Sequence, residues 1–293
     1  MPGAPYQTRL RVARADIFEA FTKLDSRILT LEQLSRLLDA NRDAWRLGNI
    51  TLQRFVELAE QTTPLRTVSL QFPYRPATRF IWGDATNFEL VQSLHSAGYF
   101  SHYSAMQLNG LTQQVPKTIY FNIEQRMRPG GGSLSQEGIN RAFKGRCRTS
   151  SNIATYRDRS ICLLNGGNTD QLGAERIDAP EGDSQIRVTN LERTLIDATI
   201  RPVYSGGVYE VLGAFTAAKD RASVNKLSAM LKKLGYTYPY HQAIGFYLER
   251  AGYRQSQLAL LRKFKIEFDF YLDYSLKQVE YDSRWRIYFP QGF

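Results

Sequence analysis

The hydrophobic period of the first 86 residues changes once, and this change constrains the fold more than any other feature. Apolar residues recur at helical spacing over residues 17–24, and again after Thr30 and Thr51, which can cap helix N-termini. Over residues 67–72 the apolar residues alternate with polar ones, and a turn and a returning strand pattern follow over residues 73–82. Three helices followed by a β-hairpin predict a winged helix-turn-helix.

The remaining chain, residues 87–293, predicts a larger unit of mixed type. Strand-like alternation at residues 118–123 and 186–188 is interspersed with short helical patterns, and a run of helical patterns extends over residues 191–264. A length of 293 residues suits two ordinary domains. We therefore predict an α+β protein with a winged helix-turn-helix domain over residues 1–86 and a larger α+β domain over residues 87–293.

Composition excludes several protein classes. With 43% apolar residues the chain can bury a core, which excludes a mainly disordered protein. We find no stretch of the roughly 18 apolar residues that a membrane-spanning helix needs, and no secretory signal pattern at the N-terminus. The two cysteines, Cys147 and Cys162, make neither a disulfide scaffold nor a zinc site. These features favour a cytoplasmic protein that does not associate with membranes.

Patterns typical of catalysis are scarce. The glycine-rich stretch over residues 128–133 lacks the Lys-Ser/Thr of a P-loop, and the three histidines show no metal-binding spacing. Cys147 lies among basic residues that could lower its pKa, although an incidental thiol is the simpler interpretation. Strand alternation places Glu267 and Asp269 on one face, near Asp273, as in a Mg²⁺-dependent nuclease, but a solvated strand face explains them better. We predict no catalytic residues, metal or cofactor, and therefore not an enzyme.

The net charge of +10 favours a polyanionic partner, nucleic acid first. If the third helix is a recognition helix, its Gln53 and Arg54 are residue types that make bidentate contacts to adenine and guanine edges. The predicted DNA-binding residues of the helices and the wing are Arg36, Arg42, Arg46, Thr51, Gln53, Arg54, Tyr74, Arg75 and Arg79. The connection over residues 41–49 is longer than a tight helix-turn-helix turn, and a helical subdomain without a DNA role is the alternative.

Positive charge is densest over residues 126–159, which carry a net charge of +6. The candidate basic surface consists of Arg126, Arg128, Arg141, Lys144, Arg146, Arg148, Arg157 and Arg159. It is either a solvated face or an electropositive surface for nucleic acid or for an acidic patch on a protein partner.

Three stretches of the sequence are similar to a known protein family. Residues 99–120, YFSHYSAMQLNGLTQQVPKTIY, resemble the start of the antitoxin domain of the AbiEi family. Residues 188–198, VTNLERTLIDA, form a second match that continues to Gly206-Gly207, and GFYLE at residues 245–249 belongs to a third. In the second match, Leu195 and Ile196 are expected to face a core, with Glu192 and Arg193 on other faces.

The resemblance implies the antitoxin of an AbiE-type toxin–antitoxin system, an abortive-infection defence against phage. In such proteins the winged helix represses the system's own promoter, and the C-terminal domain neutralises a toxin that resembles a nucleotidyltransferase. The implied partners are double-stranded promoter DNA, with inverted repeats as the expected site, and a toxin that is antagonised without necessarily forming a stable complex. A stand-alone winged-helix transcriptional regulator and a metal-dependent nuclease remain the alternatives.

Overall fold

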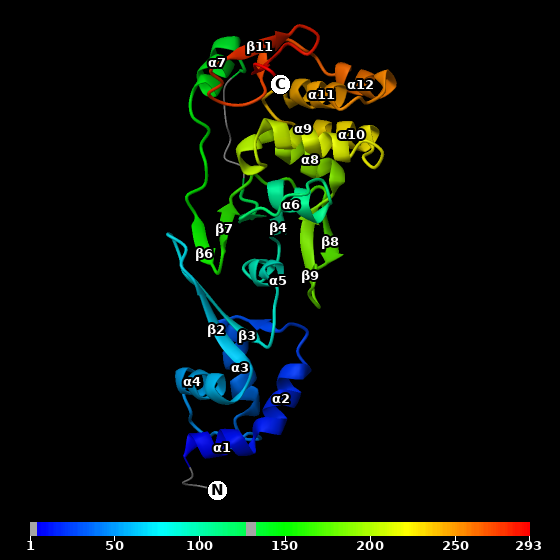
Figure 1. Ribbon diagram of the computed structural model, residues 1–293. Helices are drawn as coiled ribbons and strands as arrows, with labels where there is room; N and C mark the ends of the chain where they lie inside the picture. Colours follow the sequence, from blue (N-terminus) through cyan, green and yellow to red (C-terminus); the bar gives the residue numbers. More distant parts are fainter. Residues whose placement is uncertain (1–4, 127–132) are drawn as a thin grey trace. The chain divides into compact units, whose positions relative to one another are not determined.

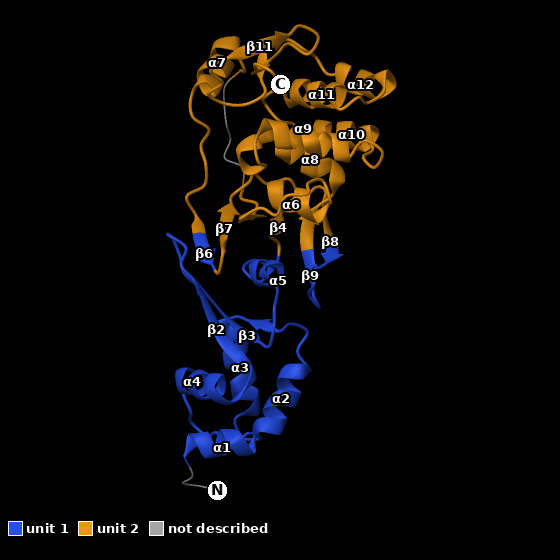
Figure 2. Cartoon of the chain, viewed as in Figure 1, with its two compact units in different colours: residues 1–96, 154–156, 177–186 blue, residues 97–153, 157–176, 187–293 orange. Residues whose placement is uncertain are grey.

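The computed structural model describes residues 5–126 and 133–293, and it shows an α+β protein with two compact units (Figures 1 and 2). Unit 1 comprises residues 1–96, 154–156 and 177–186, and unit 2 comprises residues 97–153, 157–176 and 187–293. The sequence-predicted boundary after residue 86 stays a prediction. None of the helices in the described residues is long and apolar enough to cross a membrane.

Unit 1 contains a winged helix. Its elements are α1 (Tyr6–Val12), α2 (Arg14–Thr22), β1 (Ile28–Leu29), α3 (Leu31–Asn41), α4 (Leu52–Thr62), β2 (Leu65–Leu70), β3 (Ala77–Trp82) and α5 (Asn87–Gln92). The three strands form an antiparallel sheet in the order β1-β3-β2. The sequence did not indicate β1, because two residues are too few for a period to be recognised.

Two threonines begin α3 and α4 as the sequence predicted. The Thr30 hydroxyl accepts a hydrogen bond from the backbone N–H of Gln33, and the Gln33 side-chain Oε1 accepts one from the backbone N–H of Thr30, so the pair forms a capping box. Thr51 accepts from the backbone N–H of Arg54 at 3.2 Å. Between the two helices, Trp45 is 1% exposed and stacks on Phe55 of α4 at 5.8 Å between ring centroids. The two helices therefore pack around one aromatic core.

Unit 2 is built on two sheets and a cluster of helices. Its helices are α6 (His102–Leu108), α7 (Gln136–Lys144), α8 (Leu191–Ile200), α9 (Val208–Ala217), α10 (Val224–Leu234), α11 (Tyr240–Arg250) and α12 (Gln255–Arg262), with a 3-10 turn at Pro202–Tyr204. One sheet has the order β6-β7-β5-β4-β9-β8, and parts of β6, β8 and β9 are counted with unit 1. Its strands are β4 (Tyr99–Phe100), β5 (Thr118–Asn122), β6 (Ile153–Tyr156), β7 (Arg159–Leu164), β8 (Ala174–Asp178) and β9 (Gln185–Thr189).

The second sheet of unit 2 has the order β10-β12-β11, with strands β10 (Phe270–Tyr271), β11 (Val279–Asp282) and β12 (Ile287–Pro290). The sequence predicted a strand that places Glu267 and Asp269 on one face. Only Phe270 and Tyr271 are in a strand, because the side chain of Gln136 on α7 takes the backbone hydrogen bonds of Asp269. Glu267 and Asp269 therefore precede the strand, and their predicted strand alternation was wrong.

Helix α8 lies at the centre of unit 2 and packs against α6, α9, α10 and α11. Every residue from Glu192 to Thr199 is buried. Leu195 and Ile196 face the core as expected, and the faces that carry Glu192 and Arg193 are buried as well. Arg193 Nε donates to Asp197 Oδ1 at 2.7 Å, one turn along the helix, which offsets the cost of burying both charges.

Candidate nucleic-acid interface

Helix α4 has one buried face and one exposed polar face. Phe55, Leu58 and Ala59 are at most 1% exposed and pack into the core of unit 1. Gln53 and Arg54 lie on the opposite face and are exposed to solvent. Helical spacing separates the two faces, so the residues that hold α4 in place are not those that it presents.

Glu57 joins the two exposed side chains of α4. Its carboxylate accepts from Arg54 Nη1 at 2.9 Å and from Gln53 Nε2 at 3.1 Å. These hydrogen bonds, first from Arg54 and then from Gln53, hold the pKa of Glu57 below its usual value. The side chains of Arg54 and Glu57 remain 52% and 45% exposed, so a partner can reach them. An amide and a guanidinium are thus held together on a solvent-facing helix.

Thr51 and Arg42 hold the backbone around α4. Thr51 caps the helix through its hydroxyl oxygen. Arg42 Nη1 donates to the carbonyls of Ile50 at 2.6 Å and Gly48 at 3.2 Å, and Arg42 Nε donates to Asp39 at 2.7 Å. These bonds order the connection between α3 and α4 that looked too long for a tight turn. Both residues contact their own chain, and a contact of either with DNA stays a prediction.

Two further candidate arginines lie on the surface near α4. Arg36 on α3 forms an ion pair with Glu32, and its side chain is 76% exposed. Arg46 is exposed and adopts a left-handed backbone conformation with φ of 56°. Neither side chain contributes to the core, so each remains available to a phosphate.

The last three candidate residues, Tyr74, Arg75 and Arg79, belong to the wing formed by β2 and β3, and they differ in exposure. Tyr74 at its tip is 76% exposed, and Arg75 beside it is exposed as well. Arg79 on β3 instead donates to the carbonyl of Ser93 at 2.9 Å and to the Ser93 hydroxyl at 3.1 Å. Burial lowers the pKa of the Arg79 guanidinium. Arg79 joins the wing strand to the residue that ends α5, and its predicted role at DNA gains no support.

The candidate basic surface is divided between several elements. Arg141 and Lys144 lie in the last turn of α7, and Arg146 and Arg148 follow it; all four are exposed. None of these four forms an ion pair with another residue of the described chain. Arg126 is exposed too, while Arg157 and Arg159 belong to the turn and strand after β6. Arg128 and most of the glycine-rich stretch lie outside the described residues.

The carboxylates singled out for a nuclease site are not gathered. Asp269 accepts from Arg286 Nε at 2.8 Å and from the Tyr281 hydroxyl at 2.7 Å, and Asp273 accepts from the backbone N–H of Tyr274. Over residues 5–126 and 133–293, no group of three or more His, Cys, Asp or Glu residues could hold a metal ion. Cys147 accepts from Arg201 Nη1 at 3.3 Å, and Cys162 is buried. The geometry therefore gives no support to metal-dependent cleavage by these residues.

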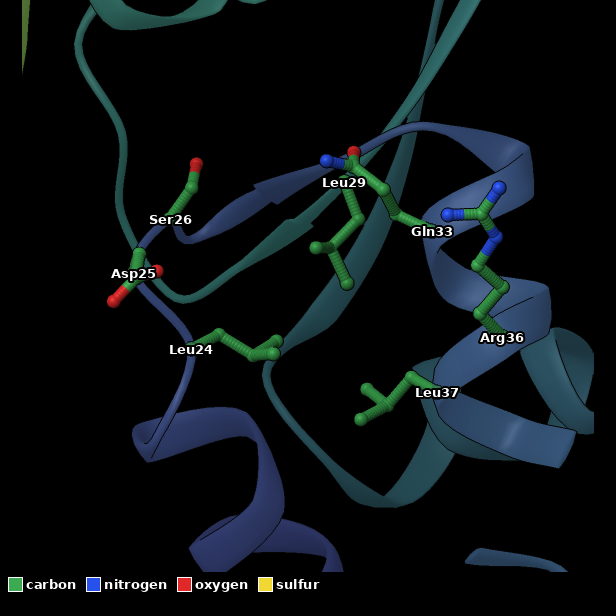
Figure 3. A pocket seen from close by; sticks show the side chains of 7 residues that line it. All are labelled: Leu24, Asp25, Ser26, Leu29, Gln33, Arg36 and Leu37. Atoms are coloured by element: carbon green, nitrogen blue, oxygen red, sulfur yellow. The ribbon is translucent and has the colours of Figure 1, made fainter. Parts of the chain in front are cut away.

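Sequence reasoning missed a shallow pocket in unit 1 (Figure 3). It has a volume of about 390 Å³ and lies where the segment after α2 meets β1 and α3. Leu24, Leu29 and Leu37 give it an apolar floor, with Gln33 and Arg36 at the side of α3. Its leucines have the helical and strand spacing of ordinary core residues, so no sequence signal distinguished them. Asp25 and Ser26 of the segment after α2 complete the lining.

No protein-family model matches the sequence, and no curated protein is significantly similar to it. Among solved structures, the chain is similar to the crystal structure of the RV2827C protein from Mycobacterium tuberculosis, with a TM-score of 0.61. The two chains are 13% identical, and the similarity covers 95% of this chain and 91% of that one. At this identity the similarity shows a shared fold extending over both units.

Proposed function

We propose that the protein is a DNA-binding antitoxin of the AbiE type that represses its own promoter. One observation carries the DNA-binding half: a winged helix presents Gln53 and Arg54, joined by Glu57, on the exposed face of α4. The antitoxin half rests on the resemblance of residues 99–120 and 188–198 to the AbiEi family.

In the proposed complex, α4 enters the major groove of duplex DNA, which admits one helix. Arg54 donates to a guanine edge and Gln53 to an adenine edge, and the wing tip with Tyr74 and Arg75 contacts phosphate or the minor groove. Arg36 and Arg46 supply further phosphate contacts. Glu57 then either releases Arg54 to the base or accepts from a cytosine amino group.

The proposed role of unit 2 is to antagonise a toxin that resembles a nucleotidyltransferase. Residues 192–199 of α8, which belong to the second stretch that resembles the family, are buried and therefore poorly placed to contact the toxin. Their similarity is therefore expected to reflect a shared core, and the antagonistic surface is expected on exposed parts of unit 2 that the resemblance does not identify.

The experiment compares repression with neutralisation in the same cells. A reporter carries the DNA upstream of this protein's reading frame. A nucleotidyltransferase-like protein encoded by a neighbouring reading frame is co-expressed as the toxin. Arg54→Ala should relieve repression about tenfold, the effect of one lost base contact, and should leave toxin rescue intact. Loss of both activities in a folded variant would contradict the assignment of the activities to separate units. Repression without any toxin to rescue would favour the stand-alone regulator.

A further inference from the structure

The sheet β10-β12-β11 of unit 2 places a row of tyrosines on its outer face. Ile287 and Phe289 of β12 are 0% and 3% exposed and point into the core, so Tyr288 between them points outward. The register pairs Tyr288 with Tyr271 on one side and with Tyr281 on the other. These three residues, the tyrosine row, therefore lie side by side across all three strands of this sheet.

The row ends at an exposed ring. The ring centroids of Tyr271 and Tyr288 are 5.0 Å apart, and those of Tyr288 and Tyr281 are 4.9 Å apart. Tyr281 belongs to the edge strand β11 and is 44% exposed. Val279, two residues earlier on the same face, is 45% exposed. An aromatic surface is thus open to a partner at the edge of the sheet.

Hydrogen bonds fix the two outer rings of the row before any partner binds. The Tyr281 hydroxyl donates to Asp269 Oδ1 at 2.7 Å, and Asp269 Oδ1 also accepts from Arg286 Nε at 2.8 Å. The Tyr271 hydroxyl donates to Asn140 Oδ1 of α7 at 3.0 Å. Rings that are already ordered lose little entropy when a planar partner stacks on them.

Exposed positive charge lies on α7, the helix that contacts the row, and in the segment after it. Lys144 follows Asn140 by four residues, so it lies one turn further along the side of α7 that contacts Tyr271. Arg141, Arg146 and Arg148 complete a set, the α7 cations, whose four members are all exposed. Figure 1 shows α7 and β11 at the same end of unit 2.

Sheet stability and an acidic protein partner each explain only part of this arrangement. Tyrosine pairs across strands stabilise sheets, which accounts for Tyr271 and Tyr288 but not for the exposed edge at Tyr281. An acidic partner would pair with the α7 cations and leave the tyrosine row without a role. Single-stranded nucleic acid uses both, because its bases stack on aromatic rings while its phosphates meet cations. We propose that the tyrosine row and the α7 cations bind single-stranded nucleic acid.

The test measures fluorescence anisotropy of a labelled 12-nucleotide oligouridylate, and of oligothymidylate of the same length, with the full chain. Alanine at Tyr281 and Tyr288 together should weaken binding about tenfold or more. Phenylalanine at the same positions keeps the rings and should retain most of the affinity. Tyr209→Ala, at a tyrosine of α9 that is 57% exposed, is the matched control and should change nothing.

A second set of variants tests the role of positive charge by comparing two pairs of basic residues in the last turns of helices of unit 2. Arg141→Ala with Lys144→Ala should lower affinity and flatten its dependence on salt, whereas Lys232→Ala with Lys233→Ala on α10 removes the same charge and should have no effect. Arg54→Ala should leave oligouridylate binding unchanged, so the proposed operator binding can be lost without affecting the tyrosine row and the α7 cations.

Three results would overturn the proposal. The first is unchanged oligonucleotide affinity in the variant with alanine at Tyr281 and Tyr288. The second is competition by polyglutamate as strong, per charge, as that by unlabelled oligouridylate, which would assign the cations to an acidic protein. The third is loss of binding in Arg54→Ala, which would place single-strand binding on unit 1. A preference between the RNA and DNA oligomers would identify which single strand the site takes.

Discussion

At the scale of single residues, Glu57 places a negative charge on the helix that is proposed to read DNA. It holds Gln53 and Arg54 in the free protein, and near DNA its charge repels phosphates. We predict that Glu57→Ala raises affinity for unrelated DNA and lowers the preference for the protein's own promoter about tenfold, the order of one base contact. Gel-shift titrations of both fragments measure this preference.

Glu19→Ala is the matched control for this prediction, because Glu19 is also an exposed carboxylate that pairs with a basic residue of its own helix region. It lies on α2, away from the predicted reading face, and should leave the preference unchanged. An unaltered preference in Glu57→Ala would limit Glu57 to a local role on α4.

The buried His102 makes the folding stability of unit 2 depend on pH. Burial lowers its pKa to about 4, well below its ordinary value of 6.5. Between these two values the unfolded chain binds a proton that the folded chain does not, so stability is full above pH 6.5 and falls as the pH drops toward 4. His102→Asn suits the left-handed backbone at φ of 51° and removes this titration.

The measurement for His102 is the melting temperature of wild type and His102→Asn from pH 7.5 to pH 4. The fall below pH 6.5 should be shallower in the variant, and the two proteins should behave alike between pH 6.5 and 7.5. The fall should not vanish, because burial also lowers the pKa of His241 to about 4. Parallel curves over the whole range would contradict the role assigned to His102.

At the scale of elements, the connection between α3 and α4 depends on Arg42. Its guanidinium bonds two backbone carbonyls, those of Gly48 and Ile50, that no helix or strand would otherwise satisfy. Arg42→Ala should therefore cost about 2 kcal/mol of the free energy of unfolding of unit 1. Arg36→Ala, which breaks only an exposed ion pair, should cost less than about 0.5 kcal/mol. Urea denaturation compares them, and equal losses would refute the role of Arg42.

The sequence predicted the elements with strong periods and clear caps. The helix starting after Thr30, the one after Thr51 and the whole of α7 were found where expected, because capping and helical spacing are local properties. Strands β1, β4, β8 and β11 were missed. β1 and β4 have two residues each, too few for a period to be recognised, and β8 and β11 show no alternation in burial that a period could reveal.

The candidate interface was predictable in type but not in detail. Exposed residues such as Gln53 and Arg54 follow from helical spacing alone. Arg42 and Arg79 are also arginines of unit 1 that were predicted to contact DNA. Each of them instead donates hydrogen bonds to backbone carbonyls of unit 1. Whether an arginine is free or used internally depends on tertiary contacts, which a period does not encode.

At the scale of the whole molecule, we propose that unit 1 reads DNA and that unit 2 has a second function. The buried α8, with its Arg193–Asp197 pair, places the second stretch that resembles the AbiEi family in the core. The tyrosine row and the α7 cations lie on the outside of the same unit. We therefore expect variants of the core residues and variants of the surface residues of unit 2 to have different effects.

The central claim is that unit 1 reads a specific duplex sequence. A gel-shift titration with the DNA just upstream of this protein's reading frame, at two salt concentrations and with an unrelated fragment beside it, tests it most directly. We expect selective retardation of the upstream fragment at about 10⁻⁸ M or below, weakening steeply with salt and lost in Arg54→Ala. Equal retardation of both fragments, unchanged by Arg54→Ala, would contradict it and leave only a basic surface.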